Sequence, residues 1–431
     1  MSKNGSISVG LMGLGVVGGG FARALKNKQL SISARVGCDL SIKRVLVRDI
    51  SKYAREGFEL TDNAQEILND PEIRIVVETI GGEHPALEYI LEAIRAGKHV
   101  VTANKEVIAK HGYDIFNLAE KHSVSVGFEA SVGGGIPIIR PLLQDLLVND
   151  IDAVHAIING TTNYILTSMS RDGLDFETAL SNAQKLGYAE ADPASDIEGL
   201  DAAYKLAILT ALAFHCQIKP NEIYQEGITA LAAEDFRYAA ELGYVIKLLA
   251  ISRKVEGFIQ ARVHPAFVPM VHSLSKIEGV LNAIELQGDL VGHVVFHGAG
   301  AGELPTTSAV TGDVLDIARS IALDGRRFPP PNLESRYTVQ DIPELETKYY
   351  LRLRANDMPG VMAQITRVLG DHQVSLASVI QKETIEDNGL AEIVITTHFA
   401  KESGVQKAVK ELSELDVVKE VCNLIRIEEL D

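Results

Sequence analysis

A glycine-rich turn between an apolar run and a helical pattern constrains this chain more than any other feature. The turn, Gly13-Leu14-Gly15-Val16-Val17-Gly18, directly follows the apolar run Ile7–Met12 and opens a helix expected over Gly19–Leu30. Dinucleotide sites need glycines at this spacing for a tight turn, for close backbone approach to a pyrophosphate and for packing of the helix on the strand. The helix N-terminus adds amide donors and a positive dipole for the phosphates. The segment therefore predicts a dinucleotide site, with a turn that holds no ligand as the alternative.

The first 130 or so residues alternate short β-branched runs with helical patterns. Strands are expected at Ile7–Met12, Arg44–Val47, Ile73–Glu78, His99–Thr102 and Val124–Glu129, and one helix between them at Glu83–Ala96. This alternation predicts an α/β fold with a Rossmann-like, doubly wound parallel sheet. We expect an NAD(P)-binding domain over residues 1–135, with a returning segment at 298–325.

The middle of the chain, residues 136–320, has an α+β pattern and is expected to form a catalytic and dimerisation domain. A helix is predicted over Ile136–Val148, a strand over Val154–Asn159, and mostly helix over 161–250, including Leu200–Phe214. Further strands are expected at Ala261–Phe267, Val280–Leu286 and His293–Phe296, followed by a glycine-rich loop at 297–305 and a helix to about Ser320.

The last part of the chain forms a separate pattern. Residues 321–347, which include Arg326–Pro331, have little periodicity and are expected to be a linker. Residues 348–431 then follow the βαββαβ order of a ferredoxin-like domain. Its expected elements are Tyr349–Arg354, Val361–Asp371, Leu376–Thr384, Leu390–Thr397, Glu402–Glu414 and Val417–Ile427.

Composition argues against several classes of protein. The net charge of −17 disfavours binding to nucleic acid or to an anionic membrane surface. The three cysteines, Cys38, Cys216 and Cys422, are far apart, which argues against a zinc site and a disulfide framework. The start of the chain lacks the apolar core of a signal peptide, and no run is long enough to span a membrane. We therefore expect a cytoplasmic protein.

Residues that follow the strands of the parallel sheet are candidates for contact with a cofactor. Arg48 and Asp49 end the second strand, where an acid binds a ribose 2′-hydroxyl and an arginine binds a 2′-phosphate. Both are present, so the choice of NAD or NADP stays open, and Arg48 favours NADP unless it is only a solvated surface residue. Thr79 and Lys105 follow the next two strands, at the edge that faces the ligand crevice, although a loop lysine is often simply solvated.

The segment Gly187–Lys205 places five carboxylates before one lysine. Asp201 and Lys205 are four residues apart, so they share one face of the predicted helix. Such a pair is ordinarily a weak surface ion pair. Here the helix continues as an apolar run that we expect to be buried, and a lysine at the mouth of a buried helix has a tunable pKa.

Three consecutive glycines follow Glu129 in the segment Phe128–Pro137. Glycines free backbone carbonyl groups to point inward, and carbonyl and carboxylate oxygens suit a hard cation. A hinge between domains is the alternative, and the two interpretations are compatible.

Taken together, these motifs resemble homoserine dehydrogenase. The resemblance covers most of residues 7–320 in the family's order and rests on the glycine turn, Thr102–Lys105, Glu129–Pro137, Asn159–Tyr164, Leu186–Lys205 and Gly298–Pro305. The last unit resembles an ACT domain, with Asn356–Val361 at its first strand-helix turn. Ser195 stands where some relatives have a second aspartate, so a role for that position in substrate binding does not carry over.

The resemblance implies reversible NAD(P)-dependent reduction of L-aspartate 4-semialdehyde to L-homoserine, on the route to threonine, methionine and isoleucine. It implies that Lys205 donates a proton, that Lys105 is a second active-site lysine, and that Asp201 orients Lys205. Glu190 and Asp196 would bind substrate, and Gly187, Gly302 and Glu303 would lie beside the cofactor. A sodium ion would be bound by Glu129 and the carbonyl groups of Val132, Gly134 and Ile136.

The ACT resemblance implies feedback control with L-threonine as effector, bound at Asn356, Asp357, Gly360 and Val361, unless the domain serves assembly only. We expect a monofunctional enzyme that forms a homodimer or homotetramer. An acylating dehydrogenase is disfavoured because no cysteine is in a recognisable site loop. A non-catalytic sensor of dinucleotide and amino acid is the other alternative, against which the Asp201–Lys205 pair argues.

Overall fold

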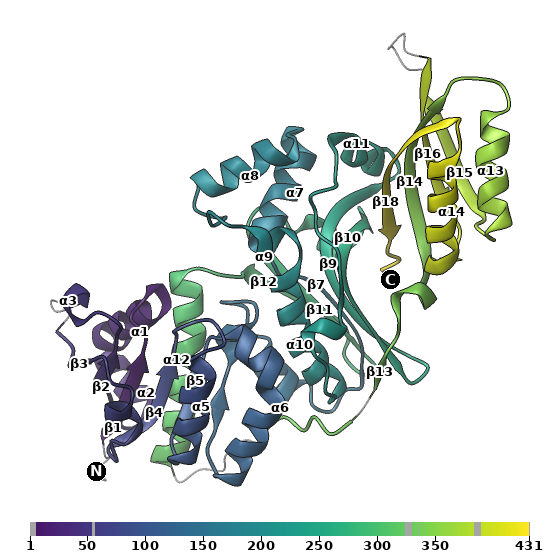
Figure 1. The fold of residues 1–431 in the computed structure, drawn as a ribbon. Coiled ribbons are helices and arrows are strands. Elements are labelled where there is room, and N and C mark those ends of the chain that lie inside the picture. The colour runs from purple at the N-terminus through teal and green to yellow at the C-terminus, as the bar shows by residue number, and fades with distance from the viewer. Residues whose placement is uncertain (1–5, 54–56, 324–329, 336, 383–388, 431) are drawn as a thin grey trace. The chain divides into compact units, whose positions relative to one another are not determined.

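A computed structural model describes residues 6–53, 57–323, 330–335, 337–382 and 389–430. The chain divides into two compact units, and each is described by itself. The first unit contains Met1–Val154, Ala203–Glu222 and Leu281–Tyr337, and the second contains His155–Ala202, Ile223–Val280 and Thr338–Asp431. Figure 1 shows the elements of both units.

The first unit is built on a six-stranded sheet in the order β3-β2-β1-β4-β5-β6, in which every neighbouring pair is parallel. This order reverses between β1 and β4, which is where doubly wound sheets open a ligand crevice, so the expected Rossmann-like fold is confirmed. The strands are β1 (Ser6–Met12), β2 (Asp39–Leu46), β3 (Leu60–Thr61), β4 (Ile73–Glu78), β5 (His99–Thr102) and β6 (Val126–Gly127).

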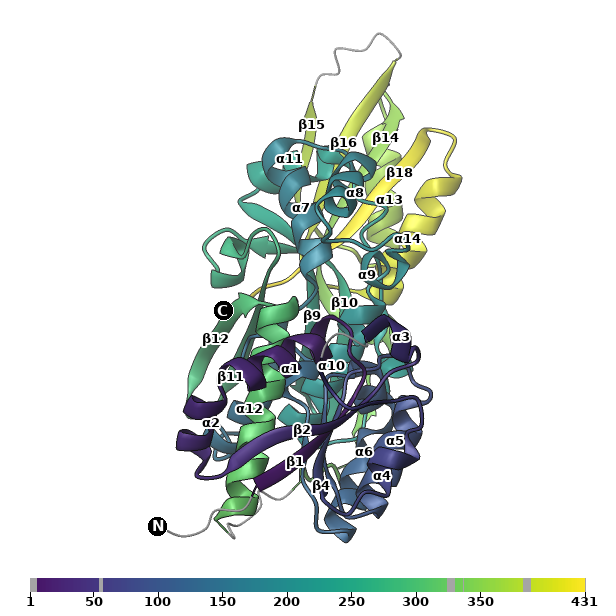
Figure 2. The same ribbon diagram turned by 90° about the vertical axis from the view of Figure 1, so that its left-hand side faces the viewer.

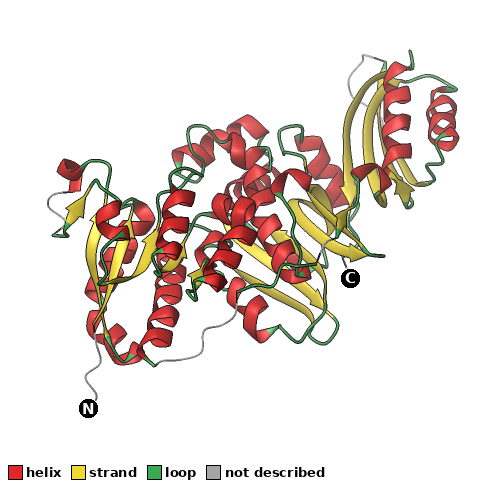
Figure 3. Cartoon of the chain, turned by 60° about the horizontal axis from the view of Figure 1, so that its bottom comes forward, coloured by secondary structure: helices red, strands yellow, loops and turns green. Residues whose placement is uncertain are grey.

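Helices cover both faces of this sheet (Figure 3). They are α1 (Val16–Asn27), α2 (Gln29–Val36), α3 (Ile50–Tyr53), α4 (Gln65–Leu68), α5 (Ala86–Arg95), α6 (Lys105–Lys121) and, from late in the chain, α12 (Glu303–Ala322). Figure 2 shows α12 beside α1. Its Val310 and Val314 are buried in the same core as Val9 and Phe21, so a segment close to 300 residues downstream completes the N-terminal sheet domain.

The first unit also contains most of α10 (Leu200–Phe214), the turn η3 (Pro220–Glu222) and the antiparallel hairpin of β11 (Leu281–Gly288) and β12 (Gly292–Ala299). The expected helix over Leu200–Phe214 is confirmed, and α10 is apolar almost all round. Strand β7 (Ile151–Ile157) lies at the boundary between the two units.

Three local expectations in the first unit are wrong. The first helix begins at Val16 and ends at Asn27, because Lys28 leaves helical geometry before α2 starts. The strand expected over Val124–Glu129 is reduced to Val126–Gly127, because the chain turns into a 3₁₀ turn, η1 (Glu129–Ser131). The helix expected over Ile136–Val148 is only a short π-helical turn, η2 (Pro141–Asp145), since Pro137 and Pro141 remove backbone donors.

The second unit combines helices with a long antiparallel hairpin. Its elements are α7 (Gly160–Asp172), α8 (Phe176–Lys185), α9 (Ala194–Ile197), β8 (Tyr224–Gln225), α11 (Ala233–Glu241), β9 (Tyr244–Val255), β10 (Phe258–Pro269) and η4 (Ser273–Lys276). Strand β9 begins inside the region expected to be mostly helical, and that expectation is wrong after residue 243. A buried apolar run shows neither the helical nor the strand period clearly, which explains the error.

The C-terminal domain lies in the second unit and has the expected βαββαβ order. It comprises β14 (Glu346–Asn356), α13 (Val361–Asp371), β15 (Leu376–Lys382), β16 (Leu390–Thr397), α14 (Glu402–Glu414) and β18 (Val418–Ile427), with short elements β13 (Thr338–Val339), η5 (Ile342–Glu344) and β17 (Ala400–Lys401). Its strands are ordered β18-β14-β16-β15, and α13 and α14 pack on one face. Some of the expected segments lie outside the described residues. These are residues 324–329 and 336 of the expected linker, of which 324 and 325 also end the expected returning segment, and the last two residues of the strand expected over Leu376–Thr384.

The C-terminal sheet continues the sheet of the β9–β10 hairpin. Strand β18 pairs in parallel with β10, with Ala266 opposite Arg426 and Phe267 opposite Ile427. The C-terminal domain is therefore joined to the rest of the second unit by main-chain pairing as well as by sequence.

Candidate active site

The glycine turn has the geometry that a dinucleotide site requires. Gly13 has φ +98°, and a Cβ on Gly18 would lie 2.1 Å from the carbonyl oxygen of Gly13, so neither position tolerates a side chain. A Cβ on Gly15 would meet nothing within 4 Å, which leaves open space in front of that backbone. Gly15 is also the N-cap of α1, and the first turn of α1 carries no acidic residue. The turn thus presents amide groups and a helix dipole to open space, which fits a pyrophosphate.

A cavity of about 480 Å³ adjoins this turn and extends along the carboxyl ends of β1, β2 and β4. Its lining includes Gly13, Leu14 and Gly15, together with Arg48 and Asp49, which follow β2, and Lys52 of α3. One carboxylate oxygen of Asp49 accepts hydrogen bonds from the Ser51 hydroxyl and amide at 2.6 and 2.9 Å, and these bonds lower the pKa of Asp49. Asp49 is therefore engaged in its own turn, and the cavity is lined by two cations, Arg48 and Lys52, and by a second acid, Asp62.

Thr79 and a residue not singled out from the sequence, Glu78, organise the loops at this edge. The Thr79 hydroxyl donates to the carbonyl oxygen of Gly13 at 3.1 Å and so closes the glycine turn from β4. The fully buried Glu78 carboxylate accepts from the Ile80 amide at 2.6 Å and from the Thr102 hydroxyl. Burial raises the pKa of Glu78. The sequence could have pointed to Glu78, because a glutamate at the end of an otherwise apolar strand is unusual.

Lys105 is the first residue of α6, directly after the N-cap Asn104. The Asn104 side chain accepts from the Val107 amide at 3.1 Å and donates to the Gly82 carbonyl at 2.7 Å. The loop after β4 and the start of α6 are therefore tied together, which fixes the position of Lys105 at the crevice edge of the sheet.

Asp201 and Lys205 stand one turn apart near the start of α10. Asp201 is only 3% exposed and Lys205 is half-buried, so the pair is not an ordinary surface ion pair. The Asn159 amide nitrogen donates to the Asp201 carboxylate at 2.9 Å and to the Asp196 carboxylate at 2.7 Å. The second unit thus brings together two of the predicted acids, and it does so through an asparagine to which the sequence assigned no role.

The other predicted residues of this acidic segment are more open. Glu190 and Gly187 are exposed, and Gly187 has φ +76°, which ends the helical run after α8. Gln184 of α8 donates to the Glu190 carbonyl at 3.2 Å. The Glu190 side chain is therefore free of burial and lies on the same loop as Asp196.

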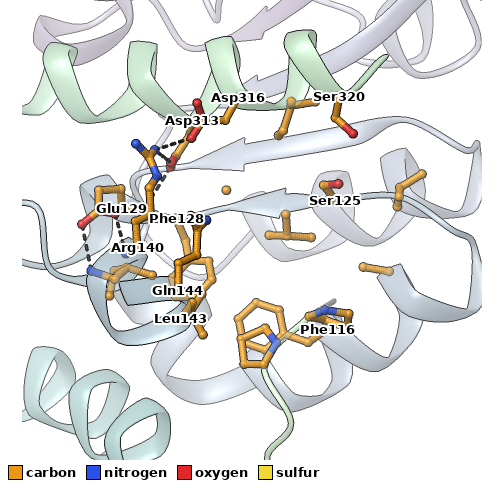
Figure 4. Close-up of a pocket in the computed structure, with 18 residues that line it drawn as sticks. Phe116, Ser125, Phe128, Glu129, Arg140, Leu143, Gln144, Asp313, Asp316 and Ser320 are labelled. Atoms are coloured by element: carbon orange, nitrogen blue, oxygen red, sulfur yellow. Dashed lines mark hydrogen bonds and ion pairs between the residues drawn. The ribbon is translucent and has the colours of Figure 1, made fainter. Parts of the chain in front are cut away.

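The predicted cation loop is held by its own acid. The Glu129 carboxylate, which is buried, accepts from the amides of Ile138, Ile139 and Arg140 at 2.6, 2.8 and 2.8 Å. Both carboxylate oxygens are thus engaged in capping the turn before η2, as Figure 4 shows for part of this network. Among the described residues, no group of three or more histidine, cysteine or acidic side chains is placed to hold a metal. A cation here would depend on main-chain oxygen.

Glycines are required around this loop. A Cβ on Gly134, which has φ +53°, would lie 2.5 Å from the Gly300 carbonyl oxygen, and one on Gly300 would lie 2.0 Å from the Asn282 side chain. Asn282 is buried, and neither of its amide atoms has a hydrogen-bond partner among the described residues. Such a side chain requires a polar partner, because burying an unpaired amide is costly. An oxygen-rich junction with an unsatisfied amide is compatible with a bound ion or water.

Asp313 of α12 supports this loop from behind. Its carboxylate accepts from the Glu129 amide at 2.9 Å and from the Arg140 guanidinium at 3.3 Å, and Arg140 also contacts Asp316 at 3.0 Å. These residues line a cavity of about 140 Å³ (Figure 4). Burial raises the pKa of Asp313 to about 7.

Gly302 and Glu303 are the N-cap and first residue of α12. Glu303 pairs with Arg23 of α1, and a Cβ on Gly20 of α1 would lie 2.3 Å from the Thr307 hydroxyl. The start of α12 therefore packs closely on the helix that follows the glycine turn, which places Gly302 and Glu303 in the dinucleotide-binding half of the first unit.

The predicted effector turn joins β14 to α13. The Asn356 amide donates to the Val417 carbonyl at 2.8 Å, and the Asp357 amide donates to the Gly389 carbonyl at 2.9 Å. Gly360, with φ +91°, is the N-cap of α13, and Val361 begins that helix with its side chain buried.

Comparison with known proteins agrees along the whole chain. Residues 137–315 match the family Homoserine dehydrogenase, residues 13–129 match Homoserine dehydrogenase, NAD binding domain, and residues 349–417 match the ACT domain. The homoserine dehydrogenase of Neisseria gonorrhoeae is 42% identical over 439 residues, covering 98% of this chain and 99% of that protein. That of Mycobacterium tuberculosis is 40% identical over 431 residues, covering 98% of each.

Solved structures give the same result. A homoserine dehydrogenase from Thiobacillus denitrificans superposes with a TM-score of 0.93 at 44% identity, covering 99% of both chains. One from S. aureus has a TM-score of 0.79 at 32% identity, covering 99% of this chain and all of the other. A hyperthermophilic archaeal homoserine dehydrogenase in complex with NADPH has a TM-score of 0.63 at 27% identity, covering 75% of this chain and 99% of that one.

The comparisons and the site therefore lead to one conclusion. The NAD-binding, catalytic and ACT parts of the chain each match a family model, and relatives of about 40% identity match over nearly the full length. Among the residues that the structure describes, no helix has the length and apolar character needed to cross a membrane. The chain belongs to the homoserine dehydrogenase family and is an NAD(P)-dependent oxidoreductase with an ACT domain.

Proposed function

We propose that Lys205 is the proton donor for interconversion of L-aspartate 4-semialdehyde and L-homoserine, with Lys105 as a second active-site cation. The single observation that carries this proposal is the burial of Asp201, one turn before the half-buried Lys205 on α10. In the direction of reduction, negative charge develops on the aldehyde oxygen, and an ammonium group within reach stabilises that charge and supplies the proton. Asp201 orients Lys205 in this proposal, and the bound nicotinamide supplies or accepts the hydride.

Glu190 and Asp196 bind the polar groups of the substrate in this proposal. Both belong to the segment between α8 and α10, in which Asp196 is part of the short helix α9, and Glu190 is exposed while Asp196 is partly exposed. Carboxylates suit an α-ammonium group and a hydroxyl group, which homoserine carries. The exposed Gly187 permits the turn that presents this loop.

The proposed cofactor is NADP, with NAD as the weaker substrate. Gly13 to Gly18 bind the pyrophosphate, Thr79 closes the turn, and Gly302 and Glu303 border the same half of the first unit. Arg48 lines the cavity just after β2 and Lys52 lines it from α3, so two cations are available to a 2′-phosphate there, beside the acids Asp49 and Asp62. The archaeal relative in complex with NADPH is consistent with this preference.

A sodium ion is proposed at the glycine loop, coordinated by the main-chain carbonyl groups of Glu129, Val132, Gly134 and Ile136. The Glu129 carboxylate does not serve as a ligand in this scheme, because it caps three amides. The tight junction of Gly134 with Gly300 and the unsatisfied Asn282 amide beside it support a polar occupant. The ion would stiffen the loop that leads from the sheet of the first unit into η2.

Regulation by L-threonine is proposed through the ACT domain, at the turn that contains Asn356, Asp357, Gly360 and Val361. The Asn356 side-chain amide, which is half-buried, and the exposed Asp357 carboxylate suit the two charged ends of an amino acid. We also propose a cytoplasmic homodimer or homotetramer, in keeping with a feedback-controlled biosynthetic enzyme.

The experiment that tests these proposals is a steady-state assay of the full-length protein with L-homoserine. Reduced nicotinamide is followed by absorbance, with NADP and with NAD, in sodium and in potassium buffers, with and without L-threonine. We expect turnover with both cofactors, a higher kcat/KM for NADP, and inhibition by L-threonine. Equal kcat/KM for the two cofactors would remove the cofactor proposal, and kinetics unchanged by L-threonine would remove the effector.

A further inference from the structure

The segment Asn159–Tyr164, at the start of α7, carries buried polar side chains, and two of them, Asn159 and Thr161, contact the acidic segment between α8 and α10. The roles proposed above use Asp196 and Asp201 but assign nothing to this segment. Its side chains contact the loop at several places, so its contribution to the reaction can be argued from geometry.

Asn159 makes the central contact. Its amide nitrogen donates to Asp196 Oδ1 at 2.7 Å and to Asp201 Oδ2 at 2.9 Å. Its amide oxygen accepts from the Thr162 main-chain N–H at 2.8 Å and lies 3.0 Å from the Thr162 hydroxyl. Because a main-chain N–H can only donate, the oxygen of the amide must face Thr162 and the NH₂ group must face the two carboxylates. With only 5% of Asn159 exposed, water does not compete for these bonds.

Thr161 and Tyr164, on the same turn of α7, contact the beginning of the acidic segment at Tyr188. The Thr161 hydroxyl donates to the Tyr188 carbonyl at 2.8 Å, and the rings of Tyr164 and Tyr188 lie 5.1 Å apart. These contacts reach the loop two residues before Glu190, whereas Asn159 reaches it at Asp196. The loop is therefore fixed at both ends by one helical turn.

The turn itself is anchored on its other side. The Asn163 amide donates to the Ile277 carbonyl at 3.2 Å, and the buried Lys247 ammonium of β9 donates to the same carbonyl and lies 3.4 Å from the Asn163 amide oxygen. A turn held from both sides is a rigid reference for the carboxylates that it contacts.

The amide is the chemical group that suits this place. Two carboxylates that share one donor nitrogen repel each other, and a primary amide has two N–H groups, one for each acceptor. Unlike a lysine, it leaves the negative charge of both acids available for other partners. An aspartate at position 159 would keep the N-cap of α7 but would offer no donor and would add a third negative charge.

We propose that Asn159 is a positioning residue that holds Asp196 and Asp201 side by side, so that one amide sets both the substrate-binding acid and the acid that orients Lys205. This proposal depends on the roles given to those two acids under the proposed function. It predicts that loss of the amide donor affects substrate affinity and turnover together, because each carboxylate governs one of them.

The test compares Asn159→Asp with Asp175→Asn in the full-length enzyme. Asp175 is the N-cap of the neighbouring helix α8, where its side chain accepts from the Thr178 amide at 2.7 Å. The control therefore exchanges aspartate for asparagine at an N-cap that contacts none of the proposed catalytic acids. For Asn159→Asp we expect kcat/KM for L-homoserine to fall about 100-fold, with kcat lowered and KM for homoserine raised. The KM for NADP should stay within about twofold of wild type. A general structural defect would instead raise the KM for the cofactor as well.

Two further variants separate positioning from folding. Asn159→Ser keeps an acceptor for the cap and one donor without adding charge, and it should recover part of the lost kcat/KM. In an Asp201→Asn background, Asn159→Asp should cost much less than in wild type, because the carboxylate that it positions is already gone.

Each outcome decides one claim. Wild-type turnover with an unaffected Asn159→Asp would overturn the positioning role and leave the proposed function standing. Equal losses in Asn159→Asp and Asp175→Asn, or full additivity in the Asp201→Asn background, would also overturn it. Absence of homoserine-dependent turnover in the wild type would instead overturn the proposed function.

Discussion

The Arg352 guanidinium of β14 donates from Nε to the Asp235 carboxylate of α11 at 2.7 Å, and both side chains are almost fully buried. The same carboxylate accepts from the Tyr350 hydroxyl at 3.0 Å and from the Asn423 amide at 2.8 Å. Burial opposes the charge of Arg352, but the hydrogen bond to Asp235 and the attraction of the neighbouring charges together outweigh burial and raise the arginine's pKa. The sheet of the C-terminal ACT domain is thus attached to the rest of the second unit by a buried ion pair as well as by the pairing of β10 with β18.

Arg352→Met should destabilise the protein by about 3–5 kcal/mol, because it leaves the Asp235 carboxylate buried without its cation. The free energy of unfolding, measured by urea denaturation, tests this. The double variant Asp235→Asn/Arg352→Met removes both charges and should recover much of the loss. If the single variant were as stable as wild type, the pair would have no structural role.

Gly15→Ala should weaken cofactor binding without changing Tm, whereas Gly18→Ala should lower Tm. A methyl group at residue 15 has open space and an ordinary φ of −77°, so Tm should be unchanged while the KM for cofactor rises about 10-fold or more. A methyl group at residue 18 collides with the Gly13 carbonyl, so Tm should fall. Thermal melting and cofactor titration distinguish the two, and an unchanged cofactor KM in Gly15→Ala would contradict the pyrophosphate site.

Arg48→Ala should lower kcat/KM for NADP by about 10- to 100-fold, because it removes a cation from the proposed 2′-phosphate site. Kinetics with NAD should be nearly unchanged. Lys43→Ala is the matched control, because Lys43 on β2 pairs with Asp70 and Glu72 and does not line the cavity. A parallel loss with both cofactors would show that Arg48 does not discriminate between them.

Asp313 should make stability depend on pH. Burial raises its pKa from 3.8 to about 7, so between these values the folded state binds a proton that the unfolded state does not. The stability that Asp313 contributes is therefore highest below the lower value and falls as the pH rises through the window. Relative to Asp313→Asn, wild type should lose up to about 4 kcal/mol across it. Urea unfolding at both ends of the window measures this, and a constant difference would refute it.

Helices and strands whose first and last residues are marked by the local sequence pattern were predictable. The helix over Val361–Asp371 and the strand over Leu390–Thr397 match the structure at both ends. Strand β9 was not predictable, because Tyr244–Val255 is buried along most of its length and lacks alternation. The prolines at 137 and 141 are visible in the sequence, but the apolar pattern around them still favours a full helix, whereas the structure has only the turn η2.

The positions of candidate residues on the fold were predictable where they lie in or beside a regular element, as for Lys105 just after β5 and Asp201 and Lys205 on one helix. They were not predictable where the chain returns from a distance. Asn159 meets carboxylates 37 and 42 residues away, and Glu129 meets Asp313, 184 residues away. Local patterns carry no information on such pairings, which follow from tertiary packing.

The role of Lys205 is the central claim, and Lys205→Ala tests it most directly against Lys185→Ala, an exposed lysine at the end of α8. The measurement is kcat for L-homoserine oxidation, together with the Kd for NADP. We predict that Lys205→Ala loses about 100- to 10,000-fold in kcat with an unchanged Kd, as expected for loss of a general acid-base group, and that Lys185→Ala behaves as wild type. A Lys205→Ala variant that retains wild-type kcat would contradict the account.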